Sequence, residues 1–298
     1  MCGIVGLFLK DRALDEQLGQ LLSQMLITMS ERGPDSAGIA IYGDPSKDES
    51  KITVQSSKHF EDFDTLENIC KQETWTNVRF LRKDNHAVII TDTMHLKDIL
   101  HYTKNHMPNL RIMSVGDSVE IYKETGLPRE VIERFSINNM SGTHGIGHTR
   151  MATESAVTTL GAHPFSTAPD QCLVHNGSLS NHNNLRRDLL RDGINIETDN
   201  DSEIAAAYLT NQMAKGLSLR NALEESLNDL DGFFTFVVGT KQGFGVLRDP
   251  IACKPAVMAE TEKFVAFGSE YRALVDLPGI EAAHIWEPEP ATVYFWGH

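Results

Sequence analysis

The sequence has few cysteines, no long apolar segment and no excess of positive charge, and each absence excludes a class of protein. Its four cysteines are far apart and form no C-x-x-C pair, which argues against a zinc ribbon or a disulfide framework and favours a reducing compartment. No apolar run reaches the length of a membrane span, and no basic stretch before an apolar core indicates a signal peptide. We therefore expect a cytoplasmic protein that contacts no membrane.

Charge and histidine spacing exclude two further classes. The 298 residues include 27 Lys and Arg against 41 Asp and Glu, a net charge of −14, and an acidic surface disfavours nucleic acid as a partner. His86, His95, His101 and His106 lack the spacing of metal ligands. The sequence therefore predicts no nucleic-acid interface and no metal site.

Hydrophobic periodicity indicates an α+β fold. Apolar residues recur at helical spacing over about 14–30 and 201–213, whereas short apolar runs between turn residues indicate strands. Strands are predicted at 4–9, 39–42, 145–149, 172–175, 233–239, 243–248 and 264–268, and a further helix at 217–227. Many short strands with interspersed helices favour stacked antiparallel sheets that are faced by helices.

The segment from about 44 to 139 differs in character, because it is polar and interrupted by turn residues. Helices are predicted near 60–72 and 96–104, and strands near 51–55, 87–91 and 119–122. Since this periodicity is regular, we interpret the segment as an α/β insertion in a single domain of residues 1–298, not as a linker.

The most informative residue is the cysteine that follows the initiator methionine. Removal of Met1 would leave Cys2 with its thiol and a free α-amine on one residue. A free α-amine has a pKa of about 7.7–8.0, so a fraction of it is unprotonated at neutral pH and can accept the thiol proton. The alternative is a buried cysteine that only begins a strand. Cys2 is therefore a candidate nucleophile whose interpretation depends on the other motifs.

Six short motifs occur in one order along the chain and are more specific together than alone. They are Met1-Cys2-Gly3-Ile4-Val5-Gly6, Arg32-Gly33-Pro34-Asp35-Ser36-Ala37-Gly38, Gly147-His148-Thr149-Arg150-Met151-Ala152-Thr153, His175-Asn176-Gly177, Asp201-Ser202-Glu203, and Arg248-Asp249-Pro250 with Lys254-Pro255. Over about 1–43 and 142–275 the chain resembles the class II, N-terminal-nucleophile glutamine amidotransferases. The resemblance implies a four-layer αββα sandwich, hydrolysis of L-glutamine to glutamate and ammonia, and no cofactor.

The resemblance assigns the chemistry to Cys2, Asn176 and Gly177. Cys2 would attack the side-chain amide carbon of glutamine to form a thioester, and the Asn176 side chain and Gly177 N–H would stabilise the oxyanion. One such donor is typically worth about 3–4 kcal/mol. Alone, Asn-Gly is typical of a type I′ hairpin turn, but His175, Asn181 and Cys2 favour the catalytic interpretation.

Two residues match family positions that hold the amino-acid end of glutamine. Arg150 would pair with the α-carboxylate, because a guanidinium binds a carboxylate bidentately. Asp201 would bind the α-ammonium group. Asp201 also suits a helix N-cap, the two roles are compatible, and Asp199 is the alternative acidic residue.

Three further residues match the family less specifically. Arg32 would orient the N-terminus and its loop, although a surface arginine in a turn is the alternative. Thr153 and His163 occupy positions where family members have substrate-pocket residues. The Arg248-Asp249-Pro250 segment is interpreted as structural.

In this family the glutaminase site usually supplies ammonia to an acceptor site on a second domain. The matching segments end near Leu274, and the remainder is too short for such a domain. We therefore expect a multi-subunit enzyme in which ammonia passes to a partner synthase. The chain is similar to stand-alone amidotransferase subunits of glutamate-synthase-like assemblies, including N-methylglutamate synthase, and the insertion would dock the partner.

Two other functions stay open. One is an independent N-terminal-cysteine amidase that acts on another amide, but Arg150 with Asp201 favours an α-amino-acid substrate. The other is a non-catalytic, glutamine-binding scaffold subunit. Binding alone needs no nucleophile, so Cys2 with Asn176 and Gly177 argues against the scaffold.

Overall fold

The fold is built from two large antiparallel sheets and one small one. The computed structural model describes residues 2–73, 75–152 and 156–298. None of the helices in these ranges is both long and apolar enough to cross a bilayer. The larger sheet has the strand order β15 (His284–Trp286), β13 (Val257–Glu260), β14 (Phe264–Gly268), β1 (Gly3–Leu9), β8 (His144–Arg150), β2 (Ser36–Tyr42) and β7 (Val119–Thr125). The second has the order β16 (Val293–Gly297), β12 (Gly243–Arg248), β11 (Gly232–Thr240), β10 (Gln171–Leu179) and β9 (Phe165–Ala168).

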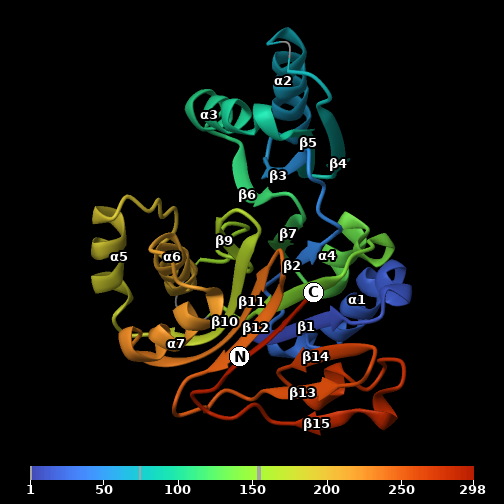
Figure 1. Cartoon of the computed structure of the whole chain (residues 1–298). Helices are drawn as coiled ribbons and strands as arrows, with labels where there is room; N and C mark the ends of the chain where they lie inside the picture. The colour runs from blue at the N-terminus through green and yellow to red at the C-terminus, as the bar shows by residue number, and fades with distance from the viewer. Residues whose placement is uncertain (1, 74, 153–155) are drawn as a thin grey trace.

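The two large sheets pack face to face, and helices cover both outer faces (Figure 1). Along β1 the side chains alternate: Ile4 and Phe8 lie in the core between the sheets, whereas Leu7 packs in the core beneath the helices. The helices are α1 (Leu18–Thr28) and α4 (Pro128–Phe135) on the larger sheet, α6 (Asp201–Ala214) and α7 (Leu219–Asp229) on the other, and α5 (His182–Arg191) on α6. This four-layer αββα arrangement confirms the predicted fold class.

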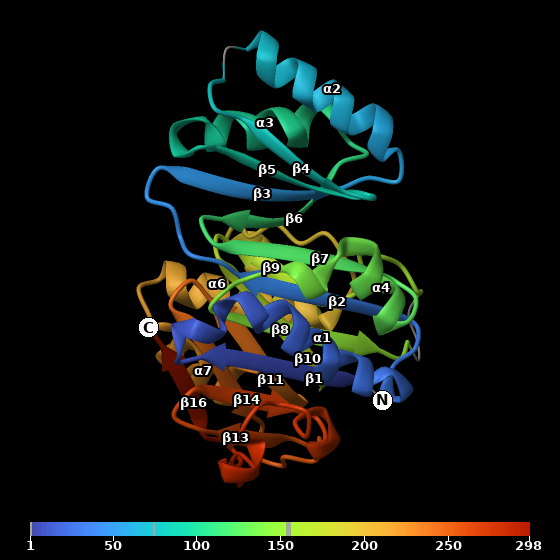
Figure 2. The ribbon, with the colours of Figure 1, turned by 90° about the vertical axis from the view of Figure 1, so that its right-hand side faces the viewer.

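The small sheet forms a separate layer at the β7 edge of the larger sheet (Figure 2). Its strands, in order, are β4 (Arg79–Lys83), β5 (His86–Asp92), β3 (Glu49–Gln55) and β6 (Arg111–Gly116), and its helices are α2 (His59–Gln72) and α3 (Leu96–His106). Phe63 of α2 and Ile99 of α3 bury one face of this sheet, whereas Val88 and Ile90 of β5 join the core around α4. The small sheet is therefore packed between its own helices and the main fold.

The structure divides the expected insertion of about 44–139 into two parts. Only residues 49–116 form the small sheet and its helices, because β7 pairs with β2 in register, from Ser36 opposite Thr125 to Tyr42 opposite Val119. The predicted helix over 14–30 is also shorter. It begins as a 3-10 helix and becomes α1 at Leu18. The 3-10 helices are η1 (Arg12–Gln17), η2 (Ser30–Arg32), η3 (Thr93–His95), η4 (Ile137–Asn139), η5 (Tyr271–Ala273) and η6 (Ile280–Ala282).

Strand register brings the sequence motifs to one end of the larger sheet. Gly3 lies opposite Thr149, and Ser36 lies opposite Arg150. Because β1 and β8 are antiparallel, Cys2 is adjacent to the carboxyl end of β8. The first three motifs therefore meet although they are far apart in the sequence.

Candidate active site

Cys2 is held through its own carbonyl group. Cys2 O accepts a hydrogen bond of 2.9 Å from Arg32 Nε and one of 3.3 Å from Asn176 Nδ2. The Cys2 side chain is partly exposed, in contrast to the buried Cys70 and Cys172. Arg32 from η2 and Asn176 from β10 thus meet at the residue that sequence reasoning singled out.

The Asn176-Gly177 pair lies within a strand and not in a turn. Asn176 is paired with Thr235 of β11, and Gly177 with Phe234. At Gly177 the backbone φ is +154°, and a Cβ atom would lie 1.9 Å from Phe233 O. Only glycine fits there. The hairpin-turn interpretation is therefore wrong. The Asn176 side-chain amide has two N–H groups, and only one of them is needed for its hydrogen bond to Cys2 O.

Arg32 is a buried residue and not a surface arginine. Besides Cys2 O, it contacts Glu270 Oε1 at 2.5 Å through Nη1, and this hydrogen bond lowers the pKa of the Glu270 carboxyl group. Arg272 Nε lies 2.6 Å from the other carboxylate oxygen. Glu270 thus fixes the guanidinium that holds Cys2.

The loop after Arg32 packs directly on the end of β8. A Cβ atom at Gly33 would lie 2.5 Å from the Arg150 carbonyl carbon, so only glycine allows this approach. Asp35 N donates to Arg150 O at 3.0 Å, and Asp35 Oδ2 accepts from Ala152 N at 2.8 Å. The loop therefore fixes the backbone that carries Arg150.

Arg150 is a buried residue at the end of β8. Its Nη1 lies 3.5 Å from Ala156 O, so the backbone at Ala156 lies beside the guanidinium. Thr153, which was predicted to line the substrate pocket, lies outside the described residues, as does Met1.

Asp201 is the first residue of α6, but it is not the helix cap. Asn200 caps the helix, because its side chain accepts from Ser202 N at 2.9 Å. The Asp201 carboxylate instead accepts from Leu179 N at 2.9 Å and ties α6 to the end of β10. Asp199, the alternative acidic residue, is exposed, and its carboxylate lies 4.0 Å from Arg186.

The chain has clear relatives among characterised families. A family model described as a glutamine amidotransferase domain matches residues 148–276. A glutamine amidotransferase-like protein, GlxB of Rhizobium meliloti, is 66% identical over 298 residues, covering 100% of this chain and 99% of the relative. The chain belongs to the class II glutamine amidotransferases. A putative glutamine amidotransferase of Methanothermobacter thermautotrophicus is 34% identical over 99% of both chains.

A solved structure shows the same fold for this amidotransferase. The glutamine phosphoribosylpyrophosphate amidotransferase of B. subtilis superimposes with a TM-score of 0.63 at 18% identity. The match covers 99% of this chain and 47% of that one, so this chain spans about half the length of the solved enzyme. At this identity the likeness establishes the fold alone.

Behind the site of the amidotransferase lies a row of buried histidines. His163 stacks on His148 with ring centroids 4.0 Å apart, and His148 Nε2 lies 3.1 Å from His175 O. His175 Nδ1 contacts Ser202 Oγ at 2.9 Å and lies 3.8 Å from Asp201 Oδ1. The predicted pocket residue His163 is thus one of three stacked or linked imidazoles.

Burial keeps these imidazoles neutral. It lowers the pKa of His148 to about 3 and that of His175 to about 4, and it lowers the pKa of His163 well below its usual value. Sequence reasoning missed the roles of His148 and Ser202, although both occur inside quoted motifs. No local pattern indicates that two residues of different motifs will share a buried contact.

The Arg248-Asp249-Pro250 segment has the structural role that was expected. Arg248 donates to the carbonyl groups of Pro288, Ala252 and Lys254, and Asp249 accepts from the N–H groups of Phe234, Ile251 and Ala252. Both side chains are buried and hydrogen-bonded to backbone groups. They fix the loop after β12 against β11, at Phe234, the residue that lies opposite Gly177.

Proposed function

We propose that this amidotransferase hydrolyses L-glutamine to glutamate and ammonia through a thioester on Cys2, after removal of Met1. The observation that carries the proposal is the double hold on Cys2 O by Arg32 and Asn176. These contacts support a thiol that acts beside the two proposed oxyanion donors, Asn176 Nδ2 and Gly177 N.

The chemistry begins with the Cys2 α-amine, which accepts the thiol proton. The sulfur attacks the side-chain amide carbon of glutamine and forms a C–S bond, while the carbonyl oxygen becomes an oxyanion. Asn176 Nδ2 and Gly177 N stabilise that oxyanion by donating hydrogen bonds. The α-ammonium group returns the proton to the leaving nitrogen, the C–N bond breaks and ammonia departs. Water, deprotonated by the same amine, then hydrolyses the thioester to glutamate and regenerates Cys2.

Recognition of the amino-acid end is assigned to two charged side chains. Arg150 pairs with the α-carboxylate of glutamine, and its burial strengthens that pairing because less water screens it. Asp201 binds the α-ammonium group through the carboxylate that Leu179 N already orients. The neutral His163 forms part of the pocket wall, and Thr153 stays a predicted pocket residue.

The ammonia passes to a partner synthase subunit of glutamate-synthase-like type. The small sheet supports a docking role, because it exposes the apolar side chains of Phe60 and Met94 at 74% and 76%. An independent amidase or a glutamine-binding scaffold is the competing function. A Cys2→Ala protein that retains full biological activity favours the scaffold.

The experiment is intact mass spectrometry before and after treatment with a diazo-ketone analogue of glutamine. Loss of Met1 and a single adduct on Cys2, blocked by L-glutamine, is the expected result. Cys253 is the one exposed free cysteine among the described residues, so Cys253→Ser is the matched control and must still be labelled. Retained Met1 without an adduct overturns the proposal.

A further inference from the structure

The segment 156–164 wraps the guanidinium group that is proposed to bind the glutamine carboxylate. Ala156 O lies 3.5 Å from Arg150 Nη1. A Cβ atom at Gly161 would lie 3.3 Å from the same nitrogen, so the glycine brings the backbone against it. The position of this segment therefore determines how much room a carboxylate has beside Arg150.

Lys123 of β7 holds one side of segment 156–164. Its buried ammonium group donates to Ala162 O at 2.8 Å, to Pro164 O at 3.1 Å and to Leu160 O at 3.3 Å. An ammonium group has three donors, and all three are used on one short stretch of backbone. A buried charge whose partners all lie in one segment fixes that segment to the strand.

Glu124, the next residue of β7, holds the same segment from the opposite face. Consecutive strand residues point to opposite faces, so the segment crosses the edge of the larger sheet at β7. Glu124 Oε1 accepts a short hydrogen bond from Thr159 Oγ1. Glu124 Oε2 accepts from Asn85 Nδ2 at 2.5 Å and lies 3.6 Å from Arg134 Nη1. One carboxylate thus joins the segment to the β4–β5 turn of the small sheet.

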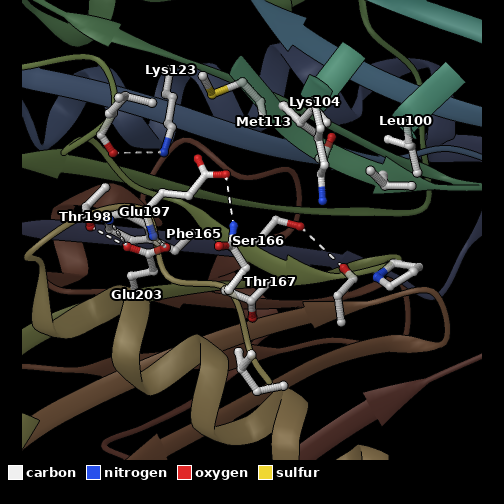
Figure 3. A pocket seen from close by; sticks show the side chains of 18 of the residues that line it. Leu100, Lys104, Met113, Lys123, Phe165, Ser166, Thr167, Glu197, Thr198 and Glu203 are labelled. Atoms are coloured by element: carbon white, nitrogen blue, oxygen red, sulfur yellow. Dashed lines mark hydrogen bonds between the residues drawn. The ribbon is translucent and has the colours of Figure 1, made fainter. Parts of the chain in front are cut away.

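Packing does not replace these polar contacts on the side of Lys123. A cavity of about 390 Å³ separates Leu160 and Phe165 from Leu100 and Lys104 of α3, and Figure 3 shows Lys123 on its wall. Atoms that border a void have no contacts on that side. The directed contacts of Lys123 and Glu124 therefore add to the packing of Leu160 and to the stacking of His163 on His148 in fixing the segment.

We propose that Lys123 and Glu124 are positioning residues for glutamine binding, which hold segment 156–164 against Arg150 and connect it, through Asn85, to the small sheet. This inference rests on the proposed function of Arg150. It makes the small sheet part of the binding apparatus, because a displacement of the β4–β5 turn reaches segment 156–164 through the side chains of Asn85, Glu124 and Thr159.

The first test is glutaminase kinetics of Lys123→Met and Lys123→Arg. We expect Lys123→Met to raise KM for glutamine by about tenfold or more with kcat nearly unchanged, because only binding geometry is lost. Lys123→Arg restores part of the loss, since it keeps a cation with several donors. Asn85→Ala gives a smaller rise in KM. Equal KM values in Lys123→Met and the unchanged protein overturn the inference.

Two further measurements separate positioning from general damage. Lys51→Met is the matched control, because Lys51 of β3 pairs with Glu120 of β7 at 2.7 Å and donates no hydrogen bond to the segment. Alkylation of Cys2 by iodoacetamide, which needs no carboxylate site, keeps its rate in Lys123→Met, whereas protection by glutamine shifts to higher concentration. A loss of alkylation in this variant contradicts positioning.

Hydrogen exchange keeps the inference testable without activity. Backbone amides of 156–164 exchange at least about tenfold faster in Lys123→Met than in Lys51→Met if Lys123 holds the segment. Unchanged exchange overturns the inference even if the enzyme is active. If the unaltered protein neither hydrolyses glutamine nor is protected by glutamine from alkylation, the proposed function is refuted instead. The exchange rates alone then decide whether Lys123 holds the segment.

Discussion

The end of the large sheets around Cys2 and the small sheet of residues 49–116 are stabilised in different ways. Around Cys2 the guanidinium groups of Arg32 and Arg150 are buried, and Arg32 makes directed contacts with both Cys2 and Glu270. On the outer side of the small sheet the ion pairs join exposed side chains, as between Arg79 and Glu49. The comparison teaches that the proposed chemistry depends on positions that tolerate little change, whereas the small sheet depends mainly on its apolar core.

The largest effect is expected when one methyl group is added beside Cys2, at Gly177, and the matched change is made near the small sheet, at Gly43. Gly177→Ala places a Cβ atom 1.9 Å from Phe233 O and displaces an oxyanion donor, so kcat should fall by about 10²–10³. Gly43 lies before the small sheet and serves as the control, because a Cβ atom there would come no closer than 3.7 Å, to Lys51 Nζ. Glutaminase assays and thermal unfolding of both variants check this. Comparable losses in Gly43→Ala would contradict the contrast.

The second prediction exchanges an arginine for methionine in each region. Arg32→Met removes a donor from Cys2 O and leaves Glu270 with less charge compensation, so stability should fall by about 1–3 kcal/mol and kcat/KM should fall with it. Arg79→Met affects an exposed pair and should cost less than about 1 kcal/mol, with activity unchanged. Urea unfolding and steady-state kinetics measure both. If the two variants behave alike, burial of Arg32 does not matter as we argue.

The third prediction concerns acid, because the main fold buries four neutral histidines and the small sheet buries one. Burial lowers the pKa of His144, His148 and His86 to about 3 and of His175 to about 4, and it also lowers that of His163. Unfolded histidines titrate near 6.5, so the unfolded state binds more protons below that pH. The free energy of unfolding should therefore keep its full value above about pH 6.5. Below that pH it should fall by about 1.4 kcal/mol per pH unit for each histidine.

Removal of the small-sheet histidine sharpens this acid prediction. His86→Phe keeps a ring beside Phe135, with centroids now 4.6 Å apart, and removes one titrating group. Urea unfolding between about pH 7 and about pH 5 should then show a free energy of unfolding that falls less steeply with decreasing pH, by the contribution of one histidine. The contribution of the four histidines of the main fold should remain. A slope that does not change, or a flat profile in the unchanged protein, contradicts the argument.

The sequence predicted many of the local elements, and it predicted long-range contacts poorly. Short apolar runs between turn residues were enough to find β1, β8 and β12, and the four-layer αββα arrangement followed from the resemblance. The pairing of β7 with β2 was missed, because a strand pattern does not identify its partner. The contact of Arg32 with Glu270 joins residues 238 positions apart and has no local signal. Asn200 replaced Asp201 as the cap because its side chain reaches Ser202 N.

The smallest effect is expected on the outer surface of the small sheet. Arg82 of β4 pairs with Asp64 at 2.7 Å and with Glu67 at 2.6 Å, and all three side chains are at least one-third exposed. Arg82→Met should therefore change the free energy of unfolding by less than about 1 kcal/mol, and molar salt should reduce the difference further because it screens exposed charges. The same salt should leave the cost of Arg32→Met nearly intact, since that guanidinium is buried. Urea unfolding of both variants at low and high salt measures these differences. A large, salt-independent effect of Arg82→Met would mean that the same kind of interaction stabilises both regions.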